Sequence, residues 1–174
     1  MFFIPGFLIS LATFPGVMVH EIAHQFFCKV SNVAVLDVRY FQLGNPAGYV
    51  LHEHPQHTGQ HLLIGLGPLF FNTILGALIA FPAVTPTMTF GAKDPVDMIL
   101  IWLGLSIAMH SFPSTGDAKS IWQSVMRPGV NIGYKLFAVP TVGLLYLGAI
   151  GSVFWLDAIY GFAVVVSLPN MIFN

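Results

Sequence analysis

The chain has 174 residues, of which 56% are hydrophobic, 14% are aromatic and only 7% are charged, and its formal net charge is −1. Soluble globular chains carry about 25% charged residues because their surfaces face water, so this composition predicts a protein that lies in a lipid bilayer. The same numbers exclude an intrinsically disordered chain and a nucleic-acid-binding protein, and the single cysteine excludes a disulfide-stabilised scaffold. We expect residues 1–174 to form one integral-membrane domain.

Long apolar stretches predict membrane-crossing helices, each of which needs about 20 mostly apolar residues. The first stretch covers residues 2–27, the second covers residues 61–81 and ends before Pro82, and the third begins at Asp94 and continues to Phe112. Asp94 is a good N-cap, and the proline after it suits the first turn of a helix. We therefore expect three spanning helices in this part of the chain.

The last apolar stretch, residues 136–173, contains a single charged side chain. One helix of that length would be about 57 Å long, nearly twice the thickness of the hydrocarbon core, so the stretch is expected to fold back. We place the break in the segment LGAIGS, with short spans over residues 136–149 and 153–170 and with Ser152 as the cap of the last helix. The expected fold is a membrane all-α, polytopic bundle of about five transmembrane helices, within a range of four to six.

Two connections between the apolar stretches carry structural signals of their own. Between the first two stretches, β-branched and aromatic residues flank the turn-forming residues 44–48, which predicts a β-hairpin at the membrane surface. After the third stretch, residues 114–127 predict a short amphipathic helix that stops at Pro128 and Gly129. Five of the six lysines and arginines lie in these two connections, so both are expected to lie inside a multi-pass protein of the cell membrane.

The segment VHEIAHQFF places the motif H-E-x-x-H within the first apolar stretch. On a helix, His20 and His24 lie one turn apart on one face, so both imidazoles can reach one metal ion while Glu21 addresses a metal-bound water. Zinc acidifies its bound water and a neighbouring carboxylate can take the proton, which favours amide hydrolysis. Because ionisable residues inside a span are costly and usually mark a site, the motif predicts a zinc centre within the membrane.

Three motifs in order along the chain resemble the site-2 protease family of intramembrane zinc metallopeptidases. They are HEIAH in the first apolar stretch, GPLFFN in the second and HSFPSTGDA after the third, and together they span about 100 residues. The resemblance implies one zinc ion bound by His20, His24 and Asp117, with Glu21 as general base and Asn72 positioning the substrate or the oxyanion. The spacing G-P-x-x-x-N is one residue longer than the family's usual G-P-x-x-N.

Several of these side chains have a structural interpretation beside the functional one. Asp117 also fits a capping box with Ser114, in which its carboxylate answers the backbone at the start of a helix. Asn72 is either part of the site or a hydrogen-bonding contact between helices. Cys28, one turn after His24, is either near the metal or a small packing residue.

A second group of histidines follows the predicted hairpin. These residues either bind a second metal, supply a ligand to the first, or lie at the membrane interface, where amphipathic rings are common. His110, at the end of the third stretch, is either a further ligand or a buried polar contact between helices. The group, called here the histidine loop, contains His52, His54, His57 and His61.

The leading functional hypothesis is an intramembrane zinc metalloendopeptidase that hydrolyses peptide bonds of transmembrane or membrane-associated proteins with a zinc-activated water. The hairpin is expected to offer a strand edge to an extended substrate. The alternative is a membrane metal-binding or metal-transport protein that uses the histidine clusters as successive ion sites. A third hypothesis is an inactive relative that acts through helix contacts.

Overall fold

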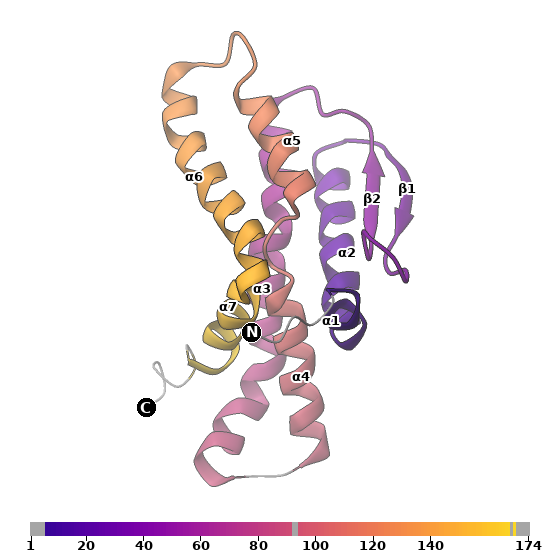
Figure 1. Ribbon diagram of the computed structural model, residues 1–174, viewed down its shortest axis with the longest axis vertical. Helices are drawn as coiled ribbons and strands as arrows, with labels where there is room; N and C mark the ends of the chain where they lie inside the picture. The colour runs from indigo at the N-terminus through magenta and orange to yellow at the C-terminus, as the bar shows by residue number, and fades with distance from the viewer. Residues whose placement is uncertain (1–5, 92–93, 168, 170–174) are drawn as a thin grey trace.

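The computed structural model describes residues 6–91, 94–167 and 169, and it is mainly helical (Figure 1). The two strands form one small antiparallel sheet. In chain order the elements are α1 (Gly6–Ala12), α2 (Phe14–Val30), β1 (Val35–Arg39), β2 (Tyr49–His52), α3 (Thr58–Phe90), α4 (Pro95–Met109), α5 (Thr115–Val125), α6 (Ile132–Gly151), η1 (Ser152–Phe154), α7 (Leu156–Phe162) and η2 (Ala163–Ser167).

Two helices are long and apolar enough to cross a membrane, namely α3 over Thr58–Val84 and α6. The bent pair α1 and α2 makes a third if it is counted as one span, whereas α4 and Leu156–Ser167 are shorter apolar helices. The described residues therefore give two or three candidate spans, fewer than the five expected. The expectation was based on the length of each apolar stretch, whereas several of these stretches form helices that are bent or too short to count as spans.

The first apolar stretch is not one continuous helix in its described part, and it remains one candidate span only if the bent pair is counted together. The chain bends by 86° between α1 and α2. Pro15 lies in the first turn of α2, where its missing N–H costs nothing. Thr13 donates its hydroxyl to the Ile9 carbonyl at 2.6 Å, and the Gly16 N–H bonds to Ser106 Oγ on α4 at 2.9 Å. The new start of α2 is thus held by local and tertiary contacts.

The predicted end of the second helix at Pro82 is wrong, because α3 continues to Phe90. Proline removes one backbone donor, yet apolar helices tolerate it where neighbouring groups compensate. The helix ends instead at Gly91, whose left-handed backbone (φ 62°) lets its N–H bond to the Thr87 carbonyl at 3.0 Å.

The remaining helix boundaries agree in part with the sequence. Asp94 caps α4 by accepting the Val96 N–H at 2.9 Å, as predicted. The C-terminal stretch breaks after Gly151, also as predicted, but Ser152 does not cap the last helix. Its hydroxyl donates to the Ala149 carbonyl at 2.8 Å, and α7 begins after Trp155.

The predicted hairpin and amphipathic helix are both confirmed. β1 and β2 pair in antiparallel fashion, with Arg39 opposite Tyr49 around the connection that contains residues 44–48. The Tyr49 hydroxyl donates to the Asp37 carboxylate at 2.6 Å, which lowers the pKa of that carboxyl. α5 begins with the Ser114 capping box and ends before Pro128 and Gly129.

α3 is the central helix, with α2, α4 and α5 packed against it. It approaches α4 most closely at Gly76 and Gly104, where a Cβ atom on Gly104 would lie 2.5 Å from the Gly76 carbonyl oxygen. The hairpin lies beside α2, the α5–α6 connection lies at one end of the molecule, and the end of α3 lies at the other (Figure 1). That both basic connections lie on the inner side of a membrane stays a prediction.

Candidate metal centre

The H-E-x-x-H motif lies in the middle of α2 and faces the other helices. His20, Glu21 and His24 are buried, with exposed fractions of 9%, 8% and 6%. Two buried imidazoles and a buried carboxylate within two helical turns carry a large desolvation cost unless they find polar partners or a cation.

Each imidazole is fixed by a backbone carbonyl far away in the sequence. His20 Nδ1 lies 2.7 Å from the His110 carbonyl oxygen, and His24 Nδ1 lies 3.1 Å from the Ile64 carbonyl oxygen. A carbonyl can only accept a hydrogen bond, so both rings donate from Nδ1. When the rings are neutral, each Nε2 therefore carries a lone pair.

The two Nε2 atoms face each other at 3.0 Å. Two lone pairs at this distance repel, so the arrangement requires a cation, either a shared proton or a metal ion. The Oδ2 atom of Asp117 lies 3.5 Å from His24 Nε2. Among the described residues, His20, His24 and Asp117 are the group of three whose ligand atoms all lie within 4.8 Å of one another. Two imidazoles and one carboxylate fit the donor set of a catalytic zinc site, which leaves a position open.

Asp117 lies where both interpretations of the sequence place it, in the capping box of α5 and beside the imidazole of His24. It completes the capping box of α5, because its carboxylate accepts the Ser114 N–H at 2.9 Å while Ser114 Oγ accepts the Asp117 N–H at 3.1 Å. Burial opposes ionisation of its carboxyl, but His24 and the Ser114 hydrogen bonds outweigh this effect and hold its pKa below the usual range. The cap thus aims an ionised carboxylate at the two imidazoles.

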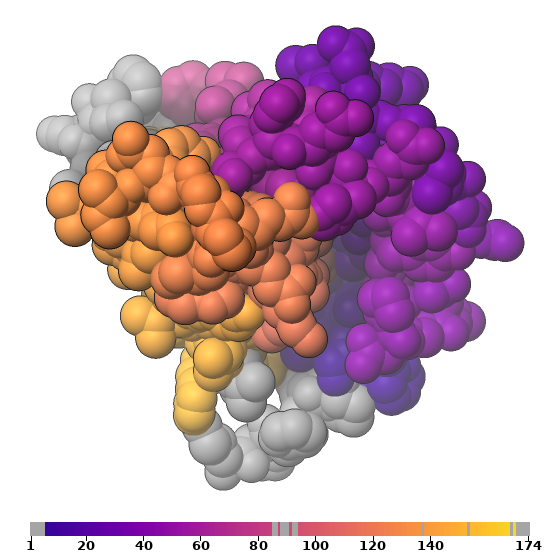
Figure 2. Space-filling model, turned by 90° about the horizontal axis from the view of Figure 1, so that it is seen from above, coloured from indigo at the N-terminus to yellow at the C-terminus, as the bar shows by residue number. Residues whose placement is uncertain are grey.

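Glu21 lines a pocket of about 340 Å³ together with His20 and His110. Residues 45–48 of the hairpin form another wall of this pocket. A Cβ atom on Gly48 would lie 2.8 Å from Glu21 Cγ, so the hairpin backbone packs directly on the glutamate side chain. Seen from above, a furrow separates the hairpin from α5, with the chain's N-terminal helical segment at its floor (Figure 2).

Asn72 is fully buried and reaches the site through another residue. Its Nδ2 donates to the His110 carbonyl at 2.8 Å, the same carbonyl that accepts from His20 Nδ1. Its Oδ1 is buried without a partner in the described part of the chain. The geometry therefore links Asn72 to His20 through one carbonyl, and a contact of Asn72 with a substrate stays a prediction.

The other candidate ligands lie outside this group of three. His110 contributes its carbonyl, while its own Nδ1 bonds to the Ser106 carbonyl at 2.9 Å. His57 caps α3 with Gln60, and the His54 ring packs on His61 with the centroids 4.9 Å apart. Cys28 lies in an apolar cluster with Val33 and Ile64, which agrees with its packing interpretation.

The carbonyl groups of Ile64 and His110, which contact the two imidazoles, were not revealed by the sequence. Every residue carries a carbonyl, so only the tertiary fold selects these two.

Comparison with protein-family models, with curated proteins and with solved structures gives no match for this chain.

Proposed function

We propose that this chain is an intramembrane zinc metalloendopeptidase that hydrolyses peptide bonds of transmembrane or membrane-associated proteins. The observation that carries the proposal is the arrangement of His20 and His24, whose Nδ1 atoms are tied to carbonyls and whose Nε2 atoms converge with the Asp117 carboxylate. Two imidazole nitrogens and one carboxylate oxygen as metal ligands, with Glu21 next to His20 in the sequence, suit hydrolytic zinc chemistry.

The exposed apolar surface of the helices supports a position in the membrane. On α3, Phe70, Ile74 and Leu78 form a stripe at helical spacing with exposed fractions of 61%, 60% and 65%. On α6, Leu144 and Leu147 are exposed to a similar extent. Such stripes are unfavourable in water and suit contact with lipid, so we propose a multi-pass protein of the cell membrane that includes the shorter apolar helices in its bundle.

In the proposed reaction, His20, His24 and Asp117 hold the metal ion. Zinc, when bound, supplies a Lewis acid that polarises a carbonyl and lowers the pKa of a water molecule. Glu21 lines a pocket together with His20, where its carboxylate would accept a proton from the attacking water and pass it to the leaving amine nitrogen. The two Nδ1 hydrogen bonds keep both imidazoles in the tautomer that this arrangement needs.

Removal of the metal is expected to abolish cleavage. The full chain, purified in detergent, should contain close to one zinc ion, and a chelator should stop cleavage of a transmembrane test peptide until Zn²⁺ is returned. Elemental analysis and gel-based cleavage measure the two quantities. The variant His57→Gln, which changes a histidine outside the ligand group, should behave as the wild type. Cleavage that persists in metal-free protein would contradict the proposal.

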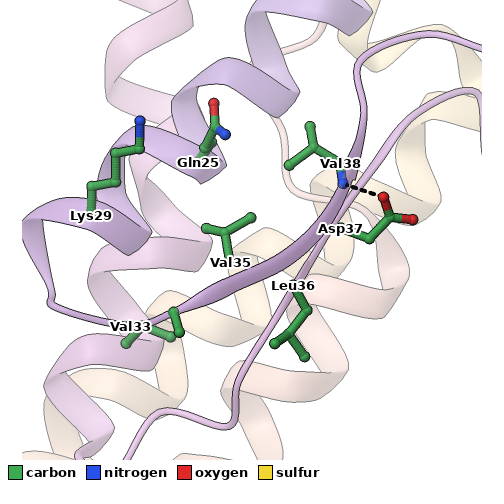
Figure 3. A pocket seen from close by; sticks show the side chains of 8 residues that line it. Gln25, Lys29, Val33, Val35, Leu36, Asp37 and Val38 are labelled. Atoms are coloured by element: carbon green, nitrogen blue, oxygen red, sulfur yellow. Dashed lines mark hydrogen bonds between the residues drawn. The ribbon is translucent and has the colours of Figure 1, made fainter.

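The strand edge offered to a substrate is proposed to be that of β2. This strand begins at Tyr49, directly after Gly48, which packs on Glu21, and it ends at His52, which lines a cavity together with Asp117. The other edge of the sheet borders a pocket of about 580 Å³ whose lining consists of Gln25, Lys29 and residues 33–38 (Figure 3). A strand added to β2 would therefore pass along the metal centre, with its amides extended and open to attack.

The backbone alternation of β2 makes this proposal testable at Val50. The Glu53 N–H bonds to the Ala34 carbonyl on the β1 side at 2.9 Å, so the N–H groups of Leu51 and Glu53 point toward β1 and that of Val50 points away from it. Val50→Pro is expected to lower cleavage at least about 10-fold, because it removes one donor from the open edge. The control Val50→Ala loses the same packing and keeps the N–H. Equal cleavage by both variants would remove strand addition from the mechanism.

A further inference from the structure

A second cavity lies beside the metal centre and has no part in the proposed reaction. Its volume is about 20 Å³, which is enough for a single water molecule or metal ion. Its polar walls come from the histidine loop and from Asp117. The lining residues are His52, His61, Ile64, Gly65, Asp117, Ser120 and Ile121.

His61 has the features of a prepared metal ligand. The side chain is buried, with an exposed fraction of 4%, and the ring is hydrogen-bonded to the backbone of Pro55. Proline has no N–H, so the ring must donate to the Pro55 carbonyl. The Nε2 atom of His61 is buried and has no partner among the described residues, which leaves Nδ1 as the donor. His61 therefore presents a lone pair on a buried Nε2, as His20 and His24 do.

His52, at the end of β2, follows the same pattern. Its Nδ1 lies 2.7 Å from the carbonyl oxygen of Glu53, so it also donates from Nδ1 and carries its lone pair on Nε2. Two imidazoles held in this tautomer and one carboxylate line the same cavity. Imidazole and carboxylate together are the ligands that zinc-class divalent cations prefer.

We propose that His52, His61 and Asp117 form an accessory binding site for a zinc-class divalent cation, through which the ion reaches the primary centre. The site shares Asp117 with that centre, so an ion can exchange one ligand at a time instead of losing all ligands at once. Among the described residues, these three ligand atoms are not within 4.8 Å of one another, so binding here is weaker and transient. The role in loading rests on the proposed function, whereas binding at the accessory site can be measured without it.

The surroundings of the cavity support uptake of an ion from the membrane surface. The histidine loop lies between the hairpin and α3, at the end of the molecule where α5 and α6 connect (Figure 1). His54 is engaged with Arg127, and this guanidinium adds a positive charge beside the cluster. A nearby positive charge disfavours tight retention of a cation, which suits a site that passes its ion onward.

The test measures Co²⁺ binding to the full chain in detergent by absorption spectroscopy. In the double variant His20→Ala with His24→Ala, the tight site is removed and one weaker site is expected to remain. Adding His61→Asn should weaken that site at least about 10-fold. Asparagine keeps a donor toward the Pro55 carbonyl and lacks Nε2, so this variant tests the ligand and spares the structural contact. Adding His57→Asn instead, which changes a histidine outside the cavity and keeps a side chain that can cap α3, should leave binding unchanged.

A kinetic measurement completes the test. In otherwise wild-type protein, His61→Asn should slow Co²⁺ uptake at least about 5-fold at sub-saturating metal, with the same final occupancy of the tight site. His52→Asn should have the same effect and replaces His61→Asn if the latter elutes as aggregate. If the double variant binds no Co²⁺, or if its weak site survives His61→Asn, the accessory site is overturned while the proposed function stands. If wild-type protein binds no metal, both proposals fail.

Discussion

Replacing Glu21 with glutamine is expected to lower the rate of peptide cleavage by about 10² to 10⁴-fold and to leave close to one zinc ion per chain. Glutamine has the shape of glutamate but cannot accept a proton at neutral pH. Glu21 lies outside the group of ligand atoms formed by His20, His24 and Asp117, so the metal content should not change. The loss should appear in kcat, because proton transfer belongs to the chemical step.

The chain contains a matched control for this experiment, since its only other glutamate is Glu53 in the histidine loop. Glu53→Gln removes the same charge without touching the pocket that Glu21 lines. Elemental analysis and cleavage of one transmembrane substrate by wild type and both variants give the comparison. A metal carrier would tolerate Glu21→Gln with little change in metal movement across vesicles. Full cleavage by Glu21→Gln would end the hydrolase proposal in its present form.

The elements that the sequence predicted well are those set by local chemistry. The hairpin follows from residues 44–48 between two β-forming runs, and the start of α4 follows from Asp94 before a proline. In each case, the residues that predict the element are also the residues that form its turn or its N-terminal cap. The ends of these elements could therefore be placed without knowledge of the rest of the chain.

The errors in the fold arise where tertiary contacts decide. The break before α2 depends on Ser106, which lies 90 positions away from the Gly16 amide that it accepts. α3 passes through Pro82 although local propensity favours a helix end there. Apolar length alone also cannot separate a helix that crosses a membrane from a shorter one packed within a bundle, such as α4.

In the candidate site, too, local spacing could be predicted from the sequence and tertiary contacts could not. The spacing of His20 and His24 predicts that their rings meet, because one helical turn separates them. The carbonyls that fix these rings belong to residues 90 and 40 positions away, and no residue type marks them. Asn72 illustrates the consequence: its residue type indicates a functional role, while only the tertiary fold shows that its amide contacts the same carbonyl as His20.

Asp117→Asn is expected to lower zinc affinity more than about 100-fold while α5 keeps its N-terminal cap. The two roles of Asp117 can be separated because a side-chain amide also serves in capping boxes. Asparagine keeps an oxygen for the Ser114 N–H, but it lacks the negative charge that a zinc ligand supplies. Equilibrium competition with a chromophoric chelator measures the affinity.

The converse variant, Ser114→Ala, should lose about 1 kcal/mol of stability and retain most of its zinc. In the wild type, the Ser114 hydroxyl accepts the Asp117 N–H and donates to the Asp117 carboxylate, but the hydroxyl is not among the ligand atoms. Thermal unfolding in detergent, with and without Zn²⁺, measures both effects, because a ligand that binds only the folded protein raises its stability. If Asp117→Asn binds zinc as tightly as the wild type, Asp117 is a capping residue only and the third ligand must come from elsewhere. His61, which presents a buried Nε2 at the cavity that Asp117 also lines, is then the first residue to replace.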